Sequence, residues 1–133
     1  MKKDNKGFSL VELIIVIAIM AVLVGVLAPQ YLKYVNNSKV STDISNAQEI
    51  ATAINVAFAD DQYSAQAASL TGSATFAVTS MPDGTSFPVS KLNSGYTWSV
   101  KCGLNGVTEI TLNSEKIYPD PKVSNGYYSN HHK

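Results

Sequence analysis

The chain has 133 residues and equal numbers of basic and acidic side chains, so its formal net charge at pH 7 is zero. Its length is that of a single domain. It contains no arginine, and the lysines from Lys33 to Lys133 are scattered, which argues against a groove for nucleic acid, where cations cluster among aromatic residues. The single cysteine, Cys102, excludes a disulfide within the chain.

An apolar segment runs from Phe8 to Pro29, and no charged or strongly polar residue interrupts it between Leu13 and Ala28. A helix needs about 20 apolar residues to cross the hydrocarbon layer of a bilayer. Lys2, Lys3 and Lys6 precede the segment, and a basic leader keeps the N-terminus cytoplasmic. A secretory signal has a shorter apolar core followed by a small-residue cleavage site, and no such site follows here. The pattern predicts one membrane-spanning helix.

The leader joins the apolar segment at the motif Gly7-Phe8-Ser9-Leu10-Val11-Glu12. This motif resembles the processing site of the type IV pilin family. It matches the family's G-F-x-x-x-E signature residue for residue, within the first quarter of the chain. The resemblance implies cleavage between Gly7 and Phe8 by a membrane prepilin peptidase, methylation of the new Phe8 amine, and a role for Glu12 and Phe8 in fibre assembly.

Glu12 is the one acidic residue of the apolar segment. A carboxylate costs about 2.5–3.5 kcal/mol at the bilayer centre and less near the interface. One interpretation is an acid in the first turn of a helix, where the helix dipole favours negative charge. The other is that Glu12 pairs in the fibre with the Phe8 ammonium created by cleavage, which would neutralise both charges and set the axial register of the subunits.

Gly25 and Pro29 lie near the end of the apolar segment. Proline lacks an amide hydrogen and clashes with the carbonyl four residues back, so we expect a kink or a loosened turn between these two residues. One interpretation ends the helix at Pro29 and makes Asn36-Asn37-Ser38 a loop. The other continues the helix through a soft spot.

The sequence after Pro29 favours a continuous helix, because apolar residues recur there at spacings of three and four. This pattern predicts an amphipathic helix over about residues 38–59, with polar residues off the apolar stripe. The stripe comprises Val40, Ile44, Ala47, Ala51, Ile54 and Phe58, and the residues off it are Ser41, Asp43, Ser45, Gln48 and Glu49. One helix over both halves would span about 50 residues, or about 75 Å.

The remaining chain predicts an antiparallel sheet over about residues 74–118, after a loop with one helical turn. The first strand alternates around Phe76 and Val78, and residues 81–94 read as loop because of their prolines and Gly84. The clearest strand turns Tyr96, Trp98, Val100 and Cys102 to one face.

Two turns set the register of this sheet. A three-residue loop, Leu104-Asn105-Gly106, would pair Lys101 with Glu109, Val100 with Ile110 and Trp98 with Leu112, with Gly106 supplying a left-handed residue. A turn at Asn113-Ser114 would then set Ile117 opposite Ile110.

Few residues are candidates for catalysis or metal binding. We expect Cys102 to be a buried small hydrophobe, and the tail from Pro119 to be extended with its tyrosines on the sheet edge or loose, leaving His131 and His132 in solvent. A calcium site at Asp120 is the alternative there, but calcium takes six or more oxygen ligands and only one acid is local. We predict no catalytic residue, no metal site and no cofactor.

Helix and sheet together predict an α+β fold, a long N-terminal helical spine packed on a small antiparallel sheet, which is the pilin architecture. We expect a leader over residues 1–7, a transmembrane and fibre-core helix over 8–29, and a globular head over 30–133. Many pilins of double-membraned bacteria have a C-terminal disulfide loop, and the departure from that pattern favours a relative from a single-membraned bacterium.

The resemblance implies a non-enzymatic subunit of a surface fibre for adhesion, surface motility and biofilm formation. It would begin as a single-pass protein of the cytoplasmic membrane and end in an extracellular fibre. The implied partners are other pilin subunits, prepilin peptidase, and the assembly platform with its ATPases. The alternatives are a minor pilin, a competence pilin, a pseudopilin of a secretion system, or a monomeric membrane-anchored binding module.

Overall fold

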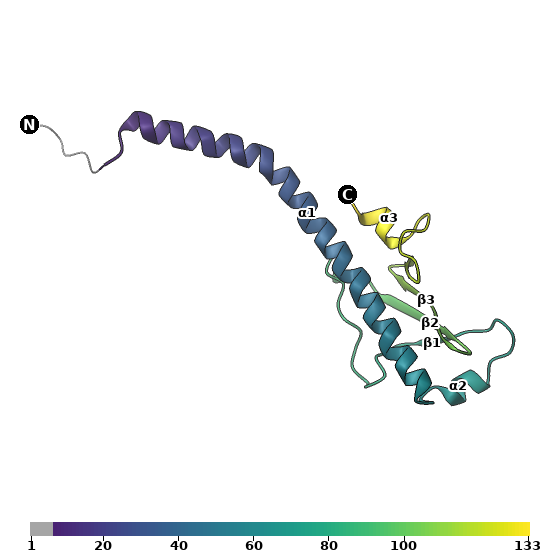
Figure 1. Cartoon of the computed structure of the whole chain (residues 1–133). Helices are drawn as coiled ribbons and strands as arrows, with labels where there is room; N and C mark the ends of the chain where they lie inside the picture. The colour runs from purple at the N-terminus through teal and green to yellow at the C-terminus, as the bar shows by residue number, and fades with distance from the viewer. Residues whose placement is uncertain (1–6) are drawn as a thin grey trace, which may run out of the picture. The chain divides into compact units, whose positions relative to one another are not determined.

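The computed structural model describes residues 7–133 and divides into two compact units. The first runs up to Val35 and the second from Asn36 to Lys133. The leader lysines Lys2, Lys3 and Lys6 lie outside the described residues. The fold is a long N-terminal helix and a small four-stranded antiparallel sheet, and the predicted α+β class is confirmed (Figure 1).

Helix α1 is continuous from Leu10 to Ala59 and contains Pro29 in its interior. The continuous interpretation is therefore confirmed, and the loop at Asn36-Asn37-Ser38 is wrong, because these residues are helical. The interior proline costs α1 one backbone hydrogen bond, and the helix resumes its ladder beyond it.

A left-handed residue ends α1. Asp61 has a φ of 59° and donates its N–H to the Phe58 carbonyl at 3.1 Å. Gln62 donates to the Ala57 carbonyl at 3.0 Å, so two carbonyls of the last turn find partners. This arrangement is the Schellman motif, and it ends the helix in water at the acidic pair.

The four strands follow one another in chain order across the sheet. They are β1 (Phe76–Val78), β2 (Trp98–Gly103), β3 (Gly106–Leu112) and β4 (Glu115–Tyr118). A short helix, α2 (Ser64–Ala68), supplies the helical turn expected before β1. Residues 79–97 cross from β1 to β2 without a strand, as their turn residues predict.

The register between β2 and β3 is confirmed over its main part. Trp98 pairs with Leu112, Val100 with Ile110, and Lys101 with Glu109. The turn differs from the predicted loop, because Gly103 pairs with Gly106 and the register shifts by one residue between Lys101 and Cys102. A bulge in β3 thus takes up the extra residue that we placed in the loop.

Gly106 has the positive φ expected of it, 134°. A side chain there would also collide with Asn55 of α1, which accepts the Val107 N–H at 2.9 Å. Glycine at this position therefore serves two purposes: it closes the hairpin, and it lets the hairpin approach the helix closely.

The pairing predicted between β3 and β4 is wrong by one residue. Asn113 and Ser114 form the expected turn, both with positive φ, but Tyr118 rather than Ile117 lies opposite Ile110. A second register shift, between Ile110 and Thr111, is the reason. Ile117 nevertheless faces the core, with 1% of its surface exposed.

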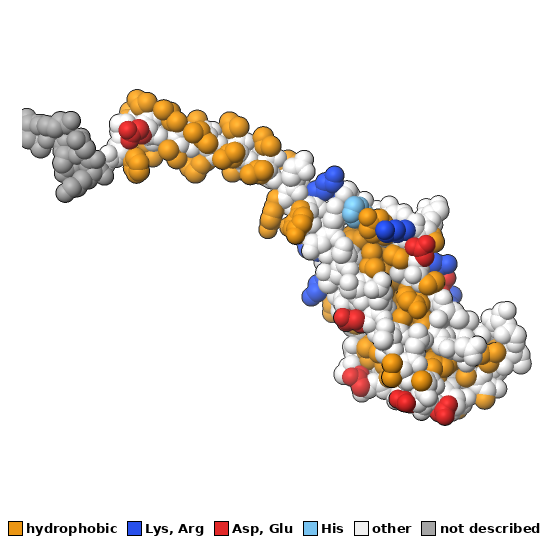
Figure 2. All heavy atoms as spheres, in the orientation of Figure 1, with side chains coloured by type: hydrophobic (Ala, Val, Ile, Leu, Met, Phe, Trp, Pro, Cys, Tyr) orange, Lys and Arg blue, Asp and Glu red, His pale blue; other side chains and the backbone are white. Residues whose placement is uncertain are grey.

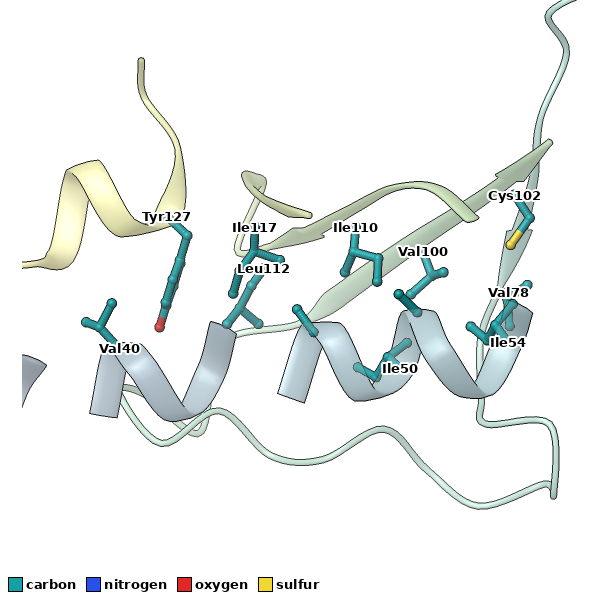
Figure 3. Close-up of a cluster of buried hydrophobic side chains, with 12 residues drawn as sticks. Val40, Ile50, Ile54, Val78, Val100, Cys102, Ile110, Leu112, Ile117 and Tyr127 are labelled. Atoms are coloured by element: carbon teal, nitrogen blue, oxygen red, sulfur yellow. The ribbon is translucent and has the colours of Figure 1, made fainter. Parts of the chain in front are cut away.

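The second half of α1 packs on the sheet through the predicted stripe (Figure 3). Val40, Ala47, Ala51 and Ile54 are buried, and Ile44 and Phe58 are half-buried against the same core. Ile50 belongs to this face as well. Val78, Val100, Cys102, Ile110, Leu112 and Ile117 complete the core from the strands.

Two predictions about polar residues are wrong. Asp43, expected off the stripe, is fully buried. The tail, expected extended or loose, forms the short helix α3 (Tyr127–His131), and Tyr127 is fully buried. The His131 side chain is largely enclosed as well, at 22% exposure. Hydrogen bonds between these two regions explain both results, as described below.

We predict that Ile54→Asp unfolds a fragment of residues 36–133, whereas Val56→Asp is tolerated. Ile54 is fully buried, and an uncompensated buried charge costs about 3–5 kcal/mol. Val56 lies two positions away on α1 with 57% of its surface exposed, so it is the matched control. Thermal melting by circular dichroism measures both. Equal melting temperatures for the two variants would mean that the buried face of α1 is assigned wrongly.

Candidate functional site

The predicted processing site lies just before helix α1. Gly7 and Phe8 precede the first helical residue, Leu10, and both are exposed, Phe8 to 82%. A Cβ added at Gly7 would meet no atom within 4 Å. The fold itself therefore does not require glycine at position 7, and a requirement for it must come from another molecule.

Ser9 and Glu12 form a reciprocal pair at the start of α1. The Glu12 N–H donates to the Ser9 Oγ at 3.1 Å, and the Ser9 N–H donates to the Glu12 Oε2 at 3.3 Å. The Ser9 carbonyl accepts the Leu13 N–H at 3.1 Å, so Ser9 is the N-cap of the helix. This is a capping box, in which two otherwise unpaired backbone donors are satisfied.

Sequence reasoning missed the role of Ser9, although the signal was present. A serine followed three residues later by glutamate, ahead of an apolar run, is the sequence signature of a capping box. The first of the two interpretations of Glu12, an acid in the first helical turn, matches its position. The pairing of Glu12 with the Phe8 amine stays a prediction, but the box directs the carboxylate back to the amide that follows Phe8.

The first half of α1 exposes its apolar side chains (Figure 2). Large apolar residues from Leu10 to Leu32 are each about half exposed or more. Within the described residues, α1 is the one helix long and apolar enough to cross a membrane, by length and composition. Gly25 contacts nothing that an added Cβ would meet. The predicted kink between Gly25 and Pro29 remains a prediction.

In the second unit, the candidates for catalysis or metal binding are buried or held by contacts with other residues. Cys102 is buried, as predicted, and burial raises the pKa of its thiol to about 11. The His131 Nε2 lies 2.6 Å from Glu115 Oε1, in contact with strand β4 rather than in solvent. Asp120 accepts the Lys122 N–H at 2.9 Å. Across residues 7–133 no three His, Cys, Asp or Glu side chains gather as metal ligands would.

Asp43 is the centre of a buried polar cluster that the sequence analysis did not anticipate. Its carboxyl oxygens accept hydrogen bonds from the Ser90 hydroxyl at 2.7 Å, from the N–H groups of Lys91 and Leu92 at 2.7 and 3.3 Å, and from the Tyr127 hydroxyl. Four donors, none a cation, thus satisfy one buried acid. In Figure 3 the Tyr127 side chain extends toward α1.

Two asparagines fasten the tail to the same helix. The Asn36 amide donates to the His131 carbonyl at 2.7 Å. Asn37 exchanges two hydrogen bonds of 2.7 Å with the backbone of Lys133. Together with Tyr127, these contacts hold α3 against α1 without a disulfide. The cluster is satisfied internally, so we assign it to the stability of the second unit rather than to ligand binding.

Comparison with known proteins bears on the N-terminal site. The family described as the prokaryotic N-terminal methylation motif matches residues 2–28. The type IV major fimbrial protein FimA of Dichelobacter nodosus is 42% identical over 60 residues, which are 45% of this chain and 38% of FimA. These findings support a type IV pilin.

Two further relatives agree with this assignment. The type IV major pilin protein PilA of Myxococcus xanthus is 38% identical over 61 residues, 45% of this chain and 28% of that protein. Prepilin peptidase-dependent protein A of Clostridium perfringens is 34% identical over 64 residues, 47% of this chain and 46% of that protein. The chain thus matches less than half the length of each of these three relatives. No solved structure matches it.

We predict that the second unit of this protein loses stability as the pH rises from about 9 to 11. Burial raises the pKa of Cys102 to about 11, and burial followed by the hydrogen bond to Asp43 raises the pKa of Tyr127 above its usual value. In the unfolded chain, cysteine ionises at about pH 8.5 and tyrosine at about pH 10. In this window the unfolded chain therefore binds fewer protons than the folded chain, and the free energy of unfolding falls with pH.

Urea unfolding of residues 36–133 at several pH values measures this dependence. Cys102→Ala should remove the lower part of the alkaline slope and Tyr127→Phe the upper part, because each variant deletes one proton that only the folded chain retains. Variants that lose stability by the same amount at pH 7 and pH 11, with an unchanged slope, would contradict the assignment.

Proposed function

We propose that the chain is a structural subunit of a type IV pilus, cut after Gly7 by prepilin peptidase and polymerised through the first half of α1. The observation that carries the proposal is the exposed first half of α1, apolar from Leu13 to Ala28 and lying within the matched methylation motif. Such a surface is unstable in water and needs either lipid or other helices around it. A membrane-anchored precursor and a helix-packed fibre core supply these two environments in turn.

The proposal extends to processing, partners and place in the cell. After cleavage the Phe8 amine is methylated, and the subunit passes from the cytoplasmic membrane into an extracellular fibre. Its partners are other pilin copies, prepilin peptidase, and the assembly platform with its ATPases. The fibre serves adhesion, surface motility or biofilm formation. The leader is residues 1–7, the segment 8–29 is the membrane and fibre-core helix, and the head follows from residue 30.

We assign no catalysis to the subunit. The thiol of Cys102 is buried with a raised pKa, and His131 is engaged by Glu115. The second candidate is a minor pilin or pseudopilin of related machinery. The match to a protein named only for its dependence on prepilin peptidase favours processing without specifying a fibre. Identification of the principal subunit in purified surface fibres decides between the two.

The processing proposal predicts a mature chain that begins at Phe8 with a methylated amine, measured by mass spectrometry of the N-terminus. Gly7→Val should block cleavage, although position 7 has open space in the fold. Gly25→Ala is the matched control, since an added Cβ also meets nothing there and the cleavage site is untouched. An assembled fibre whose chains begin at Met1 would overturn the proposal.

The assembly proposal rests on the charge of Glu12, and Glu12→Gln isolates it. Glutamine can still accept the Ser9 N–H in a capping box, but it cannot form an ion pair with the Phe8 ammonium. In a fibre core, that loss leaves one charge buried and unpaired, the costly case for a buried pair. We expect normal membrane insertion and cleavage, with fibres absent or severely reduced. Glu12→Leu, which also removes the charge, should have the same effect.

Electron microscopy of the cell surface and immunoblots of sheared fibres measure assembly, with the variant as the sole pilin. Glu49→Gln is the control, because Glu49 is an exposed acid in the second half of the same helix. Abundant normal fibres from the Glu12→Gln subunit would remove the charge from the mechanism.

A further inference from the structure

The capping box sets where α1 begins, and the proposed scissile bond lies just outside that point. Ser9 is the N-cap, and its hydrogen bonds to Glu12 and Leu13 close the first turn. Gly7 and Phe8 are neither helical nor buried. The Gly7–Phe8 bond is therefore one residue ahead of the helix, in accessible chain, which is where proteolysis concentrates.

A helix that began earlier would enclose this bond. The nearest residues upstream of Ser9 with a strong N-cap side chain are Asn5 and Asp4 in the sequence. In a helix capped at either residue, the Gly7 carbonyl would accept the Val11 N–H, since helical hydrogen bonds join residues four apart. The carbonyl that water must attack would then be bonded within the helix and turned along its axis.

We propose that Ser9 is a positioning residue for the processing reaction: by capping α1, it keeps the Gly7–Phe8 peptide outside the helix and open to the peptidase. This inference rests on the proposed function, because it presumes cleavage at this bond. Hydrolysis consumes one water and leaves a carboxylate on Gly7 and an ammonium on Phe8. Ser9 takes no part in that bond exchange and determines only the conformation in which the peptide is presented.

Four variants at position 9 separate capping from direct recognition of the serine hydroxyl. Ser9→Ala removes the cap and should lower kcat/KM for cleavage about five-fold, the usual size of an N-cap effect on a helix equilibrium. Ser9→Thr and Ser9→Asn keep a capping oxygen. Ser9→Gly has no side chain for an enzyme to read, yet glycine is a tolerable N-cap. All three should be cleaved at nearly the wild-type rate.

The assay uses the full chain in detergent micelles with membranes that contain prepilin peptidase, and mass spectrometry follows the time course. In parallel, backbone NMR shifts of Gly7 and Phe8 should move toward helical values in Ser9→Ala and stay non-helical in the other three variants. Glu12→Gln keeps the capping box and should be cleaved normally. The cleavage defect expected of Ser9→Ala is thereby distinguished from the assembly defect expected of Glu12→Gln.

The possible results are distinct. Ser9→Ala cleaved as fast as the wild type, or Gly and Asn variants as slow as Ala, would overturn the positioning role, the second result indicating direct recognition of the hydroxyl. A wild-type chain that the peptidase does not cut at Gly7–Phe8 would instead refute the proposed processing itself. A slow Ser9→Ala together with fast Gly, Asn and Thr variants supports the inference.

Discussion

Helix α1 has 50 residues, and among the residues that the structure describes its second half packs on the sheet while its first half stays exposed. This constraint governs how the sequence is arranged. From Val40 onward, apolar residues follow a single stripe, because one face meets the sheet and the other meets water. Before Pro29 the helix is apolar on all sides, which is the pattern of a helix surrounded by lipid or by other helices. One continuous backbone thus passes between two kinds of surroundings.

The second unit combines a small hydrophobic core with hydrogen bonds that hold its C-terminal tail. Four strands and the buried face of α1, from Val40 to Ala57, leave the tail as the last element to be secured. The Asp43 carboxyl group, Tyr127 and the two asparagines near the start of the unit secure it through hydrogen bonds, and Tyr127 also packs in the core. The four hydrogen bonds that the Asp43 carboxyl group accepts offset part of the desolvation cost of burying it.

Local pattern predicted most of the fold. The stripe on α1, the three central pairs of β2 with β3 and the buried Cys102 all followed from spacing and alternation. The bulges did not, since an extra residue in a strand leaves the hydrophobic pattern nearly unchanged and shows only in the pairing. Asp43 could not be placed for a different reason: its donors come from residues 47 to 84 positions away, so no local window contains them.

At the N-terminal site, the motif located Gly7, Phe8 and Glu12 but did not separate two properties of the glutamate. Its side-chain oxygen accepts the Ser9 N–H, which any acceptor of the same length can do, and its charge is a separate quantity. The oxygen acts within one chain, on where the helix begins. The charge would act only where a cation comes near it, as proposed for the fibre. Cleavage after Gly7 would create such a cation one residue before the amide that the carboxylate already holds. In the precursor the oxygen would set where the helix begins, and in the fibre the charge would take part in assembly. One side chain can serve both roles because they arise at different stages.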